Sequence, residues 1–170
     1  RARAAGYAYG GVAENIAGQV QKPPTQHTHL AMSVGGNDAL GCLPALDASC
    51  GSVLEALSRL NELQRQFANS YRLAVSAVAR LGLPCMVCTI YDRVPGLTPP
   101  LWTALSLFND VITREVIRLR LDALDLRELL LDAQDYSVVS PIEPSDVGGR
   151  KIASALHHWL QTTESSNGTR

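Results

Sequence analysis

Short apolar segments alternate with long helical patterns along this chain, and this alternation is the feature that most constrains its fold. We expect strands at residues 4–9, 28–34, 85–91 and 121–126, and helices at residues 13–21, 52–80, 100–119 and 145–161. An alternating order of this kind is typical of a parallel sheet wrapped by helices. The sequence therefore predicts an α/β fold.

The longest helical pattern, at residues 52–80, has apolar residues at spacings near three and four. They are Val53, Leu57, Leu60, Phe67, Tyr71, Val75 and Val78. We expect this face to pack on the sheet. Ser52 precedes Glu55 at the spacing of a capping box. With 170 residues, the chain is long enough for one domain with a hydrophobic core, so we expect a single domain at residues 1–162 and a polar tail at residues 163–170.

The charges of the chain nearly balance, because 15 Lys and Arg residues stand against 16 Asp and Glu residues. This balance removes the main electrostatic reason for binding nucleic acid or an anionic membrane surface, and we expect neither partner. No segment approaches the run of about 18 apolar residues that a membrane helix needs, and the first residues lack the apolar centre of a signal peptide. We therefore expect a cytoplasmic protein, with no cofactor.

The four cysteines are too few and too irregularly spaced for a disulfide framework. Cys85 and Cys88 form a C-x-x-C pattern inside an apolar strand segment, and no second pair of ligands follows at zinc-finger spacing. Core packing is therefore favoured over redox or metal chemistry for this pair, and no metal site is predicted. Cys42 and Cys50 share a short loop and could pair under oxidising conditions.

Ligands of open parallel sheets bind beyond the carboxyl ends of the strands, because loops and helix N-termini converge there. This rule selects Gly10 and Gly11, the G-G-N-D sequence at residues 35–38, Asp92, and the loop at residues 140–149. The two glycines of G-G-N-D allow a sharp backbone turn, and the Asn37 carboxamide beyond them could donate to an oxyanion. The alternative is a simple turn, because Asn and Asp tolerate left-handed backbone and bond their own loop.

The sequence S-P-I-E-P-S-D-V-G-G, at residues 140–149, leads into the last predicted helix. Ser145 can cap this helix, and the two glycines in its first turn let the helix start press against a neighbouring backbone. Glu143 is a candidate base or orienting carboxylate if its carboxyl group is buried. If it is not buried, Glu143 is an ordinary solvated loop residue.

Taken in order, these segments resemble the SGNH, or GDSL-type, hydrolase superfamily. The sequence S-V-G-G-N-D-A-L at residues 33–40 is similar to its G-x-N-D block, and Y-A-Y-G-G-V-A-E-N-I-A-G-Q-V at residues 7–20 to its glycine block. The sequence I-E-P-S-D-V-G-G-R-K-I-A-S-A-L at residues 142–156 resembles its terminal block. The resemblance spans residues 4–160 and implies a flavodoxin-like three-layer α/β/α fold and ester hydrolysis through a serine nucleophile.

The resemblance also assigns roles to residues. It implies that the Asn37 side chain is one oxyanion donor and that the backbone N–H of Gly11 is the second, or that of Gly10 if the alignment shifts by one. Gly36, Asp38 and Asp92 are then expected beside the substrate. In the family, the serine lies in a G-D-S block on the central strand, upstream of the glycine block. We expect that strand and its serine to precede residue 1, or the strand at the start of this chain to move into the vacant position, and we expect the 170 residues alone to be inactive.

The terminal block departs from the family pattern D-x-x-H. Glu143 stands at the position of the family histidine and Ser140 at that of its supporting aspartate. A carboxylate matches imidazole poorly as a base for serine near neutral pH. The histidines of the chain are poor replacements, because they lie at the start of a strand or about 18 Å along the last helix from this loop. These residues are His27, His29, His157 and His158, and we expect all four to be structural or solvated.

Three functions are compatible with these residues. The first is an ester hydrolase whose small-molecule substrate is selected by the loops at residues 39–51 and 92–100. The second is a catalytically inactive relative that keeps the cleft and binds an acyl or sugar ligand or a protein partner. The third, a phosphate-binding module, is disfavoured because no P-loop or G-x-G-x-x-G sequence follows a predicted strand.

Overall fold

The computed structural model describes Ile16 and residues 27–167, with side chains as far as Ser165. The described strands are β1 (Leu30–Met32), β2 (Cys85–Cys88) and β3 (Asp122–Leu124). The helices are α2 (Gly36–Gly41), α3 (Leu43–Leu46), α4 (Val53–Ala79), α5 (Pro99–Leu119), α6 (Leu126–Leu129) and α7 (Asp146–Asn167), with a 3-10 helix η1 (Ala133–Asp135). The strand predicted at residues 4–9 lies outside the described residues, and only Ile16 of the helix predicted at residues 13–21 is described, in helical conformation.

The three described strands form one parallel sheet in the order β1-β2-β3. In its register, Leu30 pairs with Cys85 and Met86 pairs with Asp122. Parallel neighbours need crossover connections, and α4 and α5 lie in the two that join these strands. This arrangement confirms the predicted α/β fold with a parallel sheet. β1 is at the edge of the described sheet, and the G-D-S strand that the resemblance implies beside it stays a prediction.

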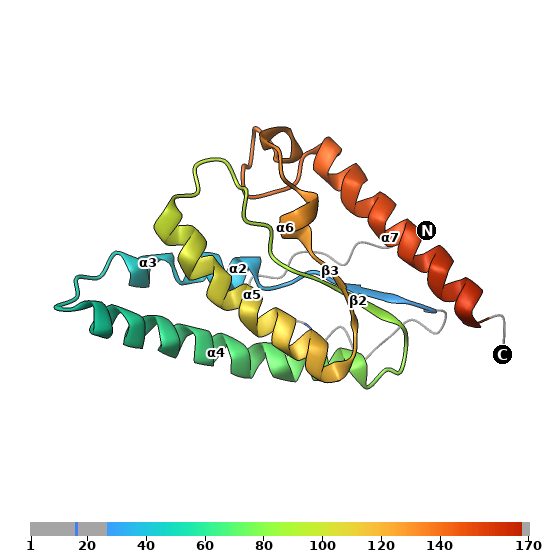
Figure 1. Cartoon of the computed structure of the whole chain (residues 1–170), viewed down its shortest axis with the longest axis horizontal. Helices are drawn as coiled ribbons and strands as arrows, with labels where there is room; N and C mark the ends of the chain where they lie inside the picture. The colour runs from blue at the N-terminus through green and yellow to red at the C-terminus, as the bar shows by residue number, and fades with distance from the viewer. Residues whose placement is uncertain (1–15, 17–26, 168–170) are drawn as a thin grey trace.

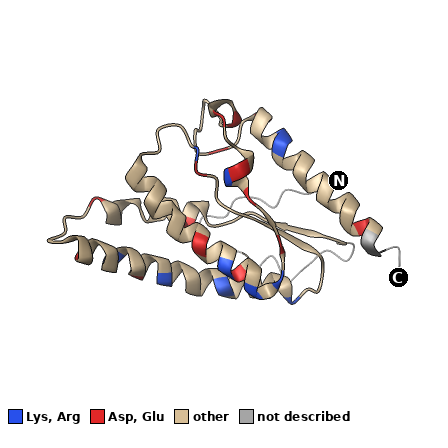
Figure 2. Cartoon of the chain, in the orientation of Figure 1, with Lys and Arg blue, Asp and Glu red and all other residues tan. Residues whose placement is uncertain are grey.

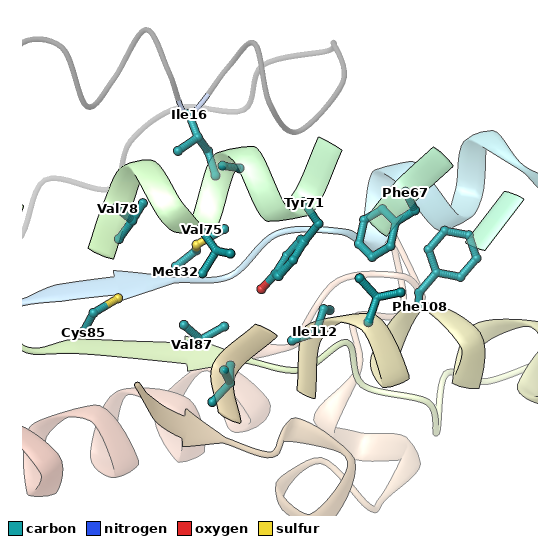
Figure 3. Packing of buried hydrophobic residues seen from close by; sticks show 13 residues of the cluster. Ile16, Met32, Phe67, Tyr71, Val75, Val78, Cys85, Val87, Phe108 and Ile112 are labelled. Carbon is teal, nitrogen blue, oxygen red and sulfur yellow. The ribbon is translucent and has the colours of Figure 1, made fainter. Parts of the chain in front are cut away.

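Helices α4 and α5 pack side by side on one face of the sheet (Figure 1). Figure 3 shows the side chains that meet there, which include Phe67, Tyr71, Val75 and Val78 of α4, Phe108 and Ile112 of α5, and Met32, Cys85 and Val87 of the strands. Burying each large apolar side chain contributes about 1.5 to 3 kcal/mol. Val53 and Leu57 were predicted on the same packed face but are exposed, because the first turns of α4 extend beyond the sheet (Figure 1).

Helix α7 covers the opposite face, which completes the three layers (Figure 1). Trp159 of α7 donates from its indole Nε1 to Asp122 Oδ2 on β3 at 2.8 Å. The ring of His29, just before β1, meets the Trp159 ring edge to face at 5.4 Å between centroids. His29 therefore has a structural role, as predicted. Helix α7 also runs through Asn167, so residues 163–167 of the predicted polar tail are helical.

The C-x-x-C pair lies within β2. Cys85 faces the core between α4 and α5, and Cys88, three residues further along the strand, points to the opposite face. Both side chains are buried, and burial raises the pKa of each thiol to about 11. Because the thiolate is the reactive form, these cysteines are suited to core packing, which confirms the predicted interpretation.

Charged residues of both signs lie along α4 and α5 (Figure 2). Several of them pair with each other, such as Glu115 of α5, which is buried and accepts from Arg72 at 2.8 Å and from Arg118 at 2.6 Å. Among the residues that the structure describes, no helix has the length and apolar character needed to cross a membrane.

Candidate functional site

The G-G-N-D sequence forms the start of a helix at the carboxyl end of β1. Gly35 has a φ of 112° and is the N-cap of α2, which begins at Gly36. A Cβ atom on Gly35 would lie 3.1 Å from Phe67 Cζ and 3.3 Å from Ile90 Cδ1, so its backbone angle favours glycine and its surroundings leave little room for a side chain. The first turn of α2 holds Asn37, which is exposed, and Asp38, which is half-buried.

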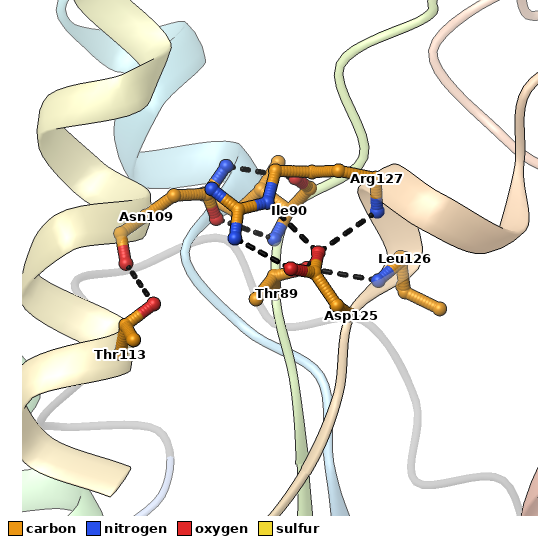
Figure 4. A network of polar contacts seen from close by, with 7 residues as sticks. All are labelled: Thr89, Ile90, Asn109, Thr113, Asp125, Leu126 and Arg127. Atoms are coloured by element: carbon orange, nitrogen blue, oxygen red, sulfur yellow. Dashed lines mark hydrogen bonds and ion pairs between the residues drawn. The ribbon is translucent and has the colours of Figure 1, made fainter. Parts of the chain in front are cut away.

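Asn109 fixes the backbone just beyond the carboxyl end of β2. Asn109 lies on α5 and is buried, with 1% of its surface exposed. Its Oδ1 accepts from the backbone N–H of Ile90 at 2.8 Å, and its Nδ2 donates to the backbone carbonyl of Ile90 at 2.9 Å (Figure 4). The amide thus makes the two backbone hydrogen bonds that a neighbouring strand would otherwise make with Ile90. Sequence reasoning missed this residue, although a polar Asn between apolar helix positions is a signal that could have found it.

A second polar cluster, at the carboxyl end of β3, consists of Thr89, Asp125 and Arg127 (Figure 4). The Thr89 hydroxyl donates to Asp125 Oδ1 at 2.8 Å and accepts from the backbone N–H of Leu126 at 2.9 Å. Arg127 binds both carboxylate oxygens of Asp125. Hydrogen bonds from Arg127, opposed by partial burial, hold the pKa of Asp125 below its usual range. This cluster, which the sequence analysis also missed, joins β2 to β3 and to the start of α6.

Asp92, predicted beside the substrate, lies four residues past the end of β2 and is half-buried. Its Oδ1 is buried without a hydrogen-bond partner and lies 3.7 Å from Arg93 Nε. Nearby, the Tyr136 hydroxyl accepts from the backbone N–H of Arg93 at 3.2 Å and donates to the carbonyl of Leu130 at 2.9 Å. The segment after β2 is therefore tied to the chain that follows α6.

The loop that contains Glu143 folds upon itself. The backbone N–H of Ser137 donates to the carbonyl of Glu143 at 2.9 Å, and the N–H of Glu143 donates to the carbonyl of Ser140 at 2.9 Å. The hydroxyl of Tyr91 donates to the carbonyl of Ile142, which ties the loop to the end of β2. The Glu143 side chain is exposed, so the burial on which its prediction as a base depended is absent.

The start of α7 presses against the η1 helix, as the glycines predicted. Ser145 caps α7 by accepting from the backbone N–H of Val147 at 3.1 Å, and its own N–H donates to the carbonyl of Asp135 at 2.8 Å. A Cβ on Gly148 would lie only 2.2 Å from that carbonyl oxygen. Lys151 Nζ lies 2.7 Å from the fully buried carboxylate of Asp135. These contacts hold the Glu143 loop between two fixed ends.

Replacing Lys151 by Met should weaken the protein at neutral pH much more than at acid pH. Burial acts to raise the pKa of Asp135, but the hydrogen bonds from Lys151 and from the backbone N–H of Asp132 outweigh burial and hold that pKa below its usual range. A carboxyl with a lowered pKa stabilises the fold above the unfolded pKa of about 4, and this stabilisation is lost as the pH falls through the folded pKa.

Urea unfolding between pH 3 and pH 7 measures this effect. We expect the difference in unfolding free energy between wild type and Lys151→Met to be largest at pH 7 and to shrink toward pH 3. The neighbouring Arg150→Met, which removes an exposed cation, is the matched control and should show little difference at either pH. A loss of stability in Lys151→Met that is the same at both pH values would contradict the role of the Asp135 carboxylate.

The carboxyl ends of the three strands share one edge of the sheet, and contacts link them there. Ile90 lies against Gly35, and Tyr91 binds the loop that carries Glu143. No hydrogen bond or ion pair joins Asn37, Asp92 and Glu143 to one another in the described part of the chain. Gly11 lies outside the described residues. The roles predicted for Asn37, Gly36, Asp38, Asp92, Glu143 and Gly11 thus stay predictions.

Other groups lie away from this edge. His27, His157 and His158 are exposed. Within residues 27–167 and Ile16, no three His, Cys, Asp or Glu side chains are grouped so that they could hold a metal ion. A hollow beside α6 and α7 contains none of the predicted site residues, since it is lined by Leu129, Val147, Arg150, Lys151, Ser154 and Ala155.

Comparison with known proteins identifies the fold. No protein-family model and no curated protein matches the chain. An acetyl-xylooligosaccharide esterase from Geobacillus Stearmophilus, solved as a mutant, is similar with a TM-score of 0.56 and 16% identity, over 83% of this chain and 59% of its own. An acetyl xylan esterase is similar with a TM-score of 0.52 and 15% identity, over 75% of this chain and 66% of its own. This chain therefore spans less than two thirds of either protein, and at such identities the likeness shows the α/β fold alone.

Proposed function

We propose that this chain carries the oxyanion-stabilising part of an ester hydrolase of the SGNH type. The observation that carries the proposal is the helix start after β1. Gly35, in a left-handed conformation that only glycine adopts easily, turns the chain so that Asn37 falls in the first turn of α2, beyond the carboxyl end of a parallel strand. The fold shared with two esterase structures supports the same class of reaction.

In the proposed reaction, a serine hydroxyl attacks the carbonyl carbon of an ester, and the carbonyl oxygen becomes an oxyanion. The Asn37 carboxamide and the backbone N–H of Gly11 donate hydrogen bonds to this oxyanion, and donors aimed at developing charge lower the barrier. The alcohol leaves with a proton, and water then releases the acid from the serine. The family resemblance assigns the serine to a G-D-S block upstream of the glycine block, so the full-length protein is the form to test.

The substrate we propose is a small-molecule ester. Gly36, Asp38 and Asp92 would lie beside it, and the loops at residues 39–51 and 92–100 would select it. Because the two similar structures are esterases of acetylated xylan or xylo-oligosaccharide, acetyl esters are the first to be tested. Glu143 stands at the position of the family histidine, and it would act as the base or orient it only where substrate binding buries its carboxylate, which is exposed in the structure.

Turnover of p-nitrophenyl acetate and p-nitrophenyl butyrate by the full-length protein tests the proposal. We expect hydrolysis above the uncatalysed rate, and faster hydrolysis of the acetate. Glu143→Gln should lower kcat if the carboxylate takes part in proton transfer, whereas Glu164→Gln, on the exposed surface of α7, should not. If neither ester is hydrolysed by the full-length protein, the enzyme proposal is wrong.

A second candidate is a catalytically inactive relative that binds an acyl or sugar ligand. The exposed side chain of Glu143 favours it, because a solvated carboxylate is a weak base for serine. This candidate predicts no turnover of either ester, together with a rise in melting temperature when acetylated xylo-oligosaccharide is added.

A further inference from the structure

We infer that Asn109 is a positioning residue that holds the Asn37 carboxamide in place through Ile90 and Gly35. This inference rests on the proposed function, in which Asn37 is an oxyanion donor. Asn109 lies on α5 and Asn37 lies on α2, far apart in the sequence. Three successive contacts make it.

The first contact is the pair of hydrogen bonds between Asn109 and the backbone of Ile90. The last described ladder bond between β2 and β3 runs from the Thr89 N–H to the Leu124 carbonyl at 3.1 Å. At the next residue, the Asn109 amide binds both the N–H and the carbonyl of Ile90. Two bonds from one rigid planar group fix the orientation of a peptide as well as its position. Asn109 is itself held, since it is almost fully buried within α5.

The second contact is between the Ile90 side chain and Gly35. Ile90 Cδ1 lies 3.3 Å from the point that a Cβ of Gly35 would occupy, and Phe67 and Ile112 close the same space from α4 and α5. Gly35 is buried in this niche. A shift of the Ile90 backbone would therefore move one of the side chains that surround Gly35. Because the surrounding side chains are closely packed, Gly35 would have to shift with it.

The third contact is within helix α2, at its start. Gly35 is the N-cap of α2, and its carbonyl accepts from the backbone N–H of Ala39 at 3.0 Å. Asn37 is in the turn that this bond closes. The helix has six residues and none of them is buried, so its own packing does little to place it. The niche around Gly35 thus sets where Asn37 stands at the edge of the sheet.

A double-mutant cycle on ester hydrolysis by the full-length protein tests the inference. Asn109→Leu keeps a similar side-chain volume and removes both bonds to Ile90. We expect it to lower kcat for p-nitrophenyl acetate by about 10- to 100-fold with little change in KM, as displaced catalytic groups do. In an Asn37→Ala background, the same change should lower kcat less than twofold, because the group that Asn109 positions is already absent.

Gln64→Leu is the matched control. Gln64 is also a partly buried amide that binds α5, through the carbonyl of Leu107 and Asp110 Oδ2, and neither of these hydrogen bonds involves Ile90. We expect it to leave kcat within about twofold of wild type. If Asn109→Leu does not fold, Ile90→Val removes the Cδ1 atom that meets Gly35 and should lower kcat in the same direction, again only when Asn37 is present.

The outcomes separate the inference from the proposed function. Equal losses from Asn109→Leu with and without Asn37 would overturn the inference while leaving the oxyanion role of Asn37 intact. If the wild-type protein hydrolyses no ester, the proposed function fails, and the side-chain amide signal of Asn37 in a nitrogen–proton NMR spectrum still tests the positioning. That signal should move in Asn109→Leu and stay in place in Gln64→Leu, and an unmoved signal in both would overturn the inference.

Discussion

Replacing Asn37 by Ala in the full-length protein is expected to lower kcat for p-nitrophenyl acetate by about 10²- to 10³-fold, the usual cost of losing one side-chain oxyanion donor. The Asn37 carboxamide would meet the charge that develops in the transition state, so KM should change little. Stability should also change little, because the side chain is exposed and α2 buries none of its residues. Steady-state kinetics and a melting curve measure both expectations.

Asn69→Ala is the control for this prediction. Asn69 is an exposed asparagine within α4, and its loss should leave kcat unchanged. The alternative interpretation of G-G-N-D as a simple turn predicts the same small effect on kcat at both positions. A loss in Asn37→Ala of less than about threefold would therefore favour that interpretation over the oxyanion role.

Replacing Gly148 by Ala should have the largest effect on stability. Its Cβ would lie 2.2 Å from the Asp135 carbonyl oxygen and 3.1 Å from the carbonyl carbon, and neither backbone atom can move aside alone. The same carbonyl accepts from the Ser145 N–H, which sets the start of α7. We expect the unfolding free energy to fall by about 3 kcal/mol or more, at the upper end of what overpacking costs.

Gly149→Ala is the matched control, one residue further along α7. A Cβ at Gly149 would meet nothing within 4 Å. Since Ala is a better helix former than Gly, this change should stabilise the protein by about 0.5 to 1 kcal/mol. Urea unfolding compares the two variants. The close approach of α7 to η1 would be contradicted if both glycines tolerated alanine equally.

The order of the elements could be predicted from the sequence because periodicity depends on local residues. Three predicted strands and the helices α4, α5 and α7 are present, with ends that differ by at most six residues, whereas the short helices α2, α3 and α6 were not predicted. The strand predicted at residues 85–91 ends at Cys88, because Asn109 rather than a neighbouring strand binds Ile90. Such an end depends on a residue from another helix, and no local pattern in the strand reveals it.

The candidate site was predicted less completely than the fold. The G-G-N-D sequence predicted a sharp turn after β1, and Gly35 makes it with a positive φ, but the helix α2 that follows was not predicted. The cluster of Thr89, Asp125 and Arg127 could not be predicted, because Thr89 and Asp125 follow two different strands and their contact depends on the sheet register. The exposure of Glu143 is likewise set by how its loop folds between η1 and α7.

The most direct test of the proposed serine esterase is covalent labelling of the full-length protein with a fluorophosphonate, followed by peptide mass mapping. Such a probe reacts with activated serines whatever the natural ester is, so the result does not depend on choosing the right substrate. We predict one label per protein, on a serine upstream of Gly10, with ester hydrolysis lost in proportion to labelling. The proposal would be contradicted if an excess of the probe left the protein unmodified, or if the label fell within residues 27–167.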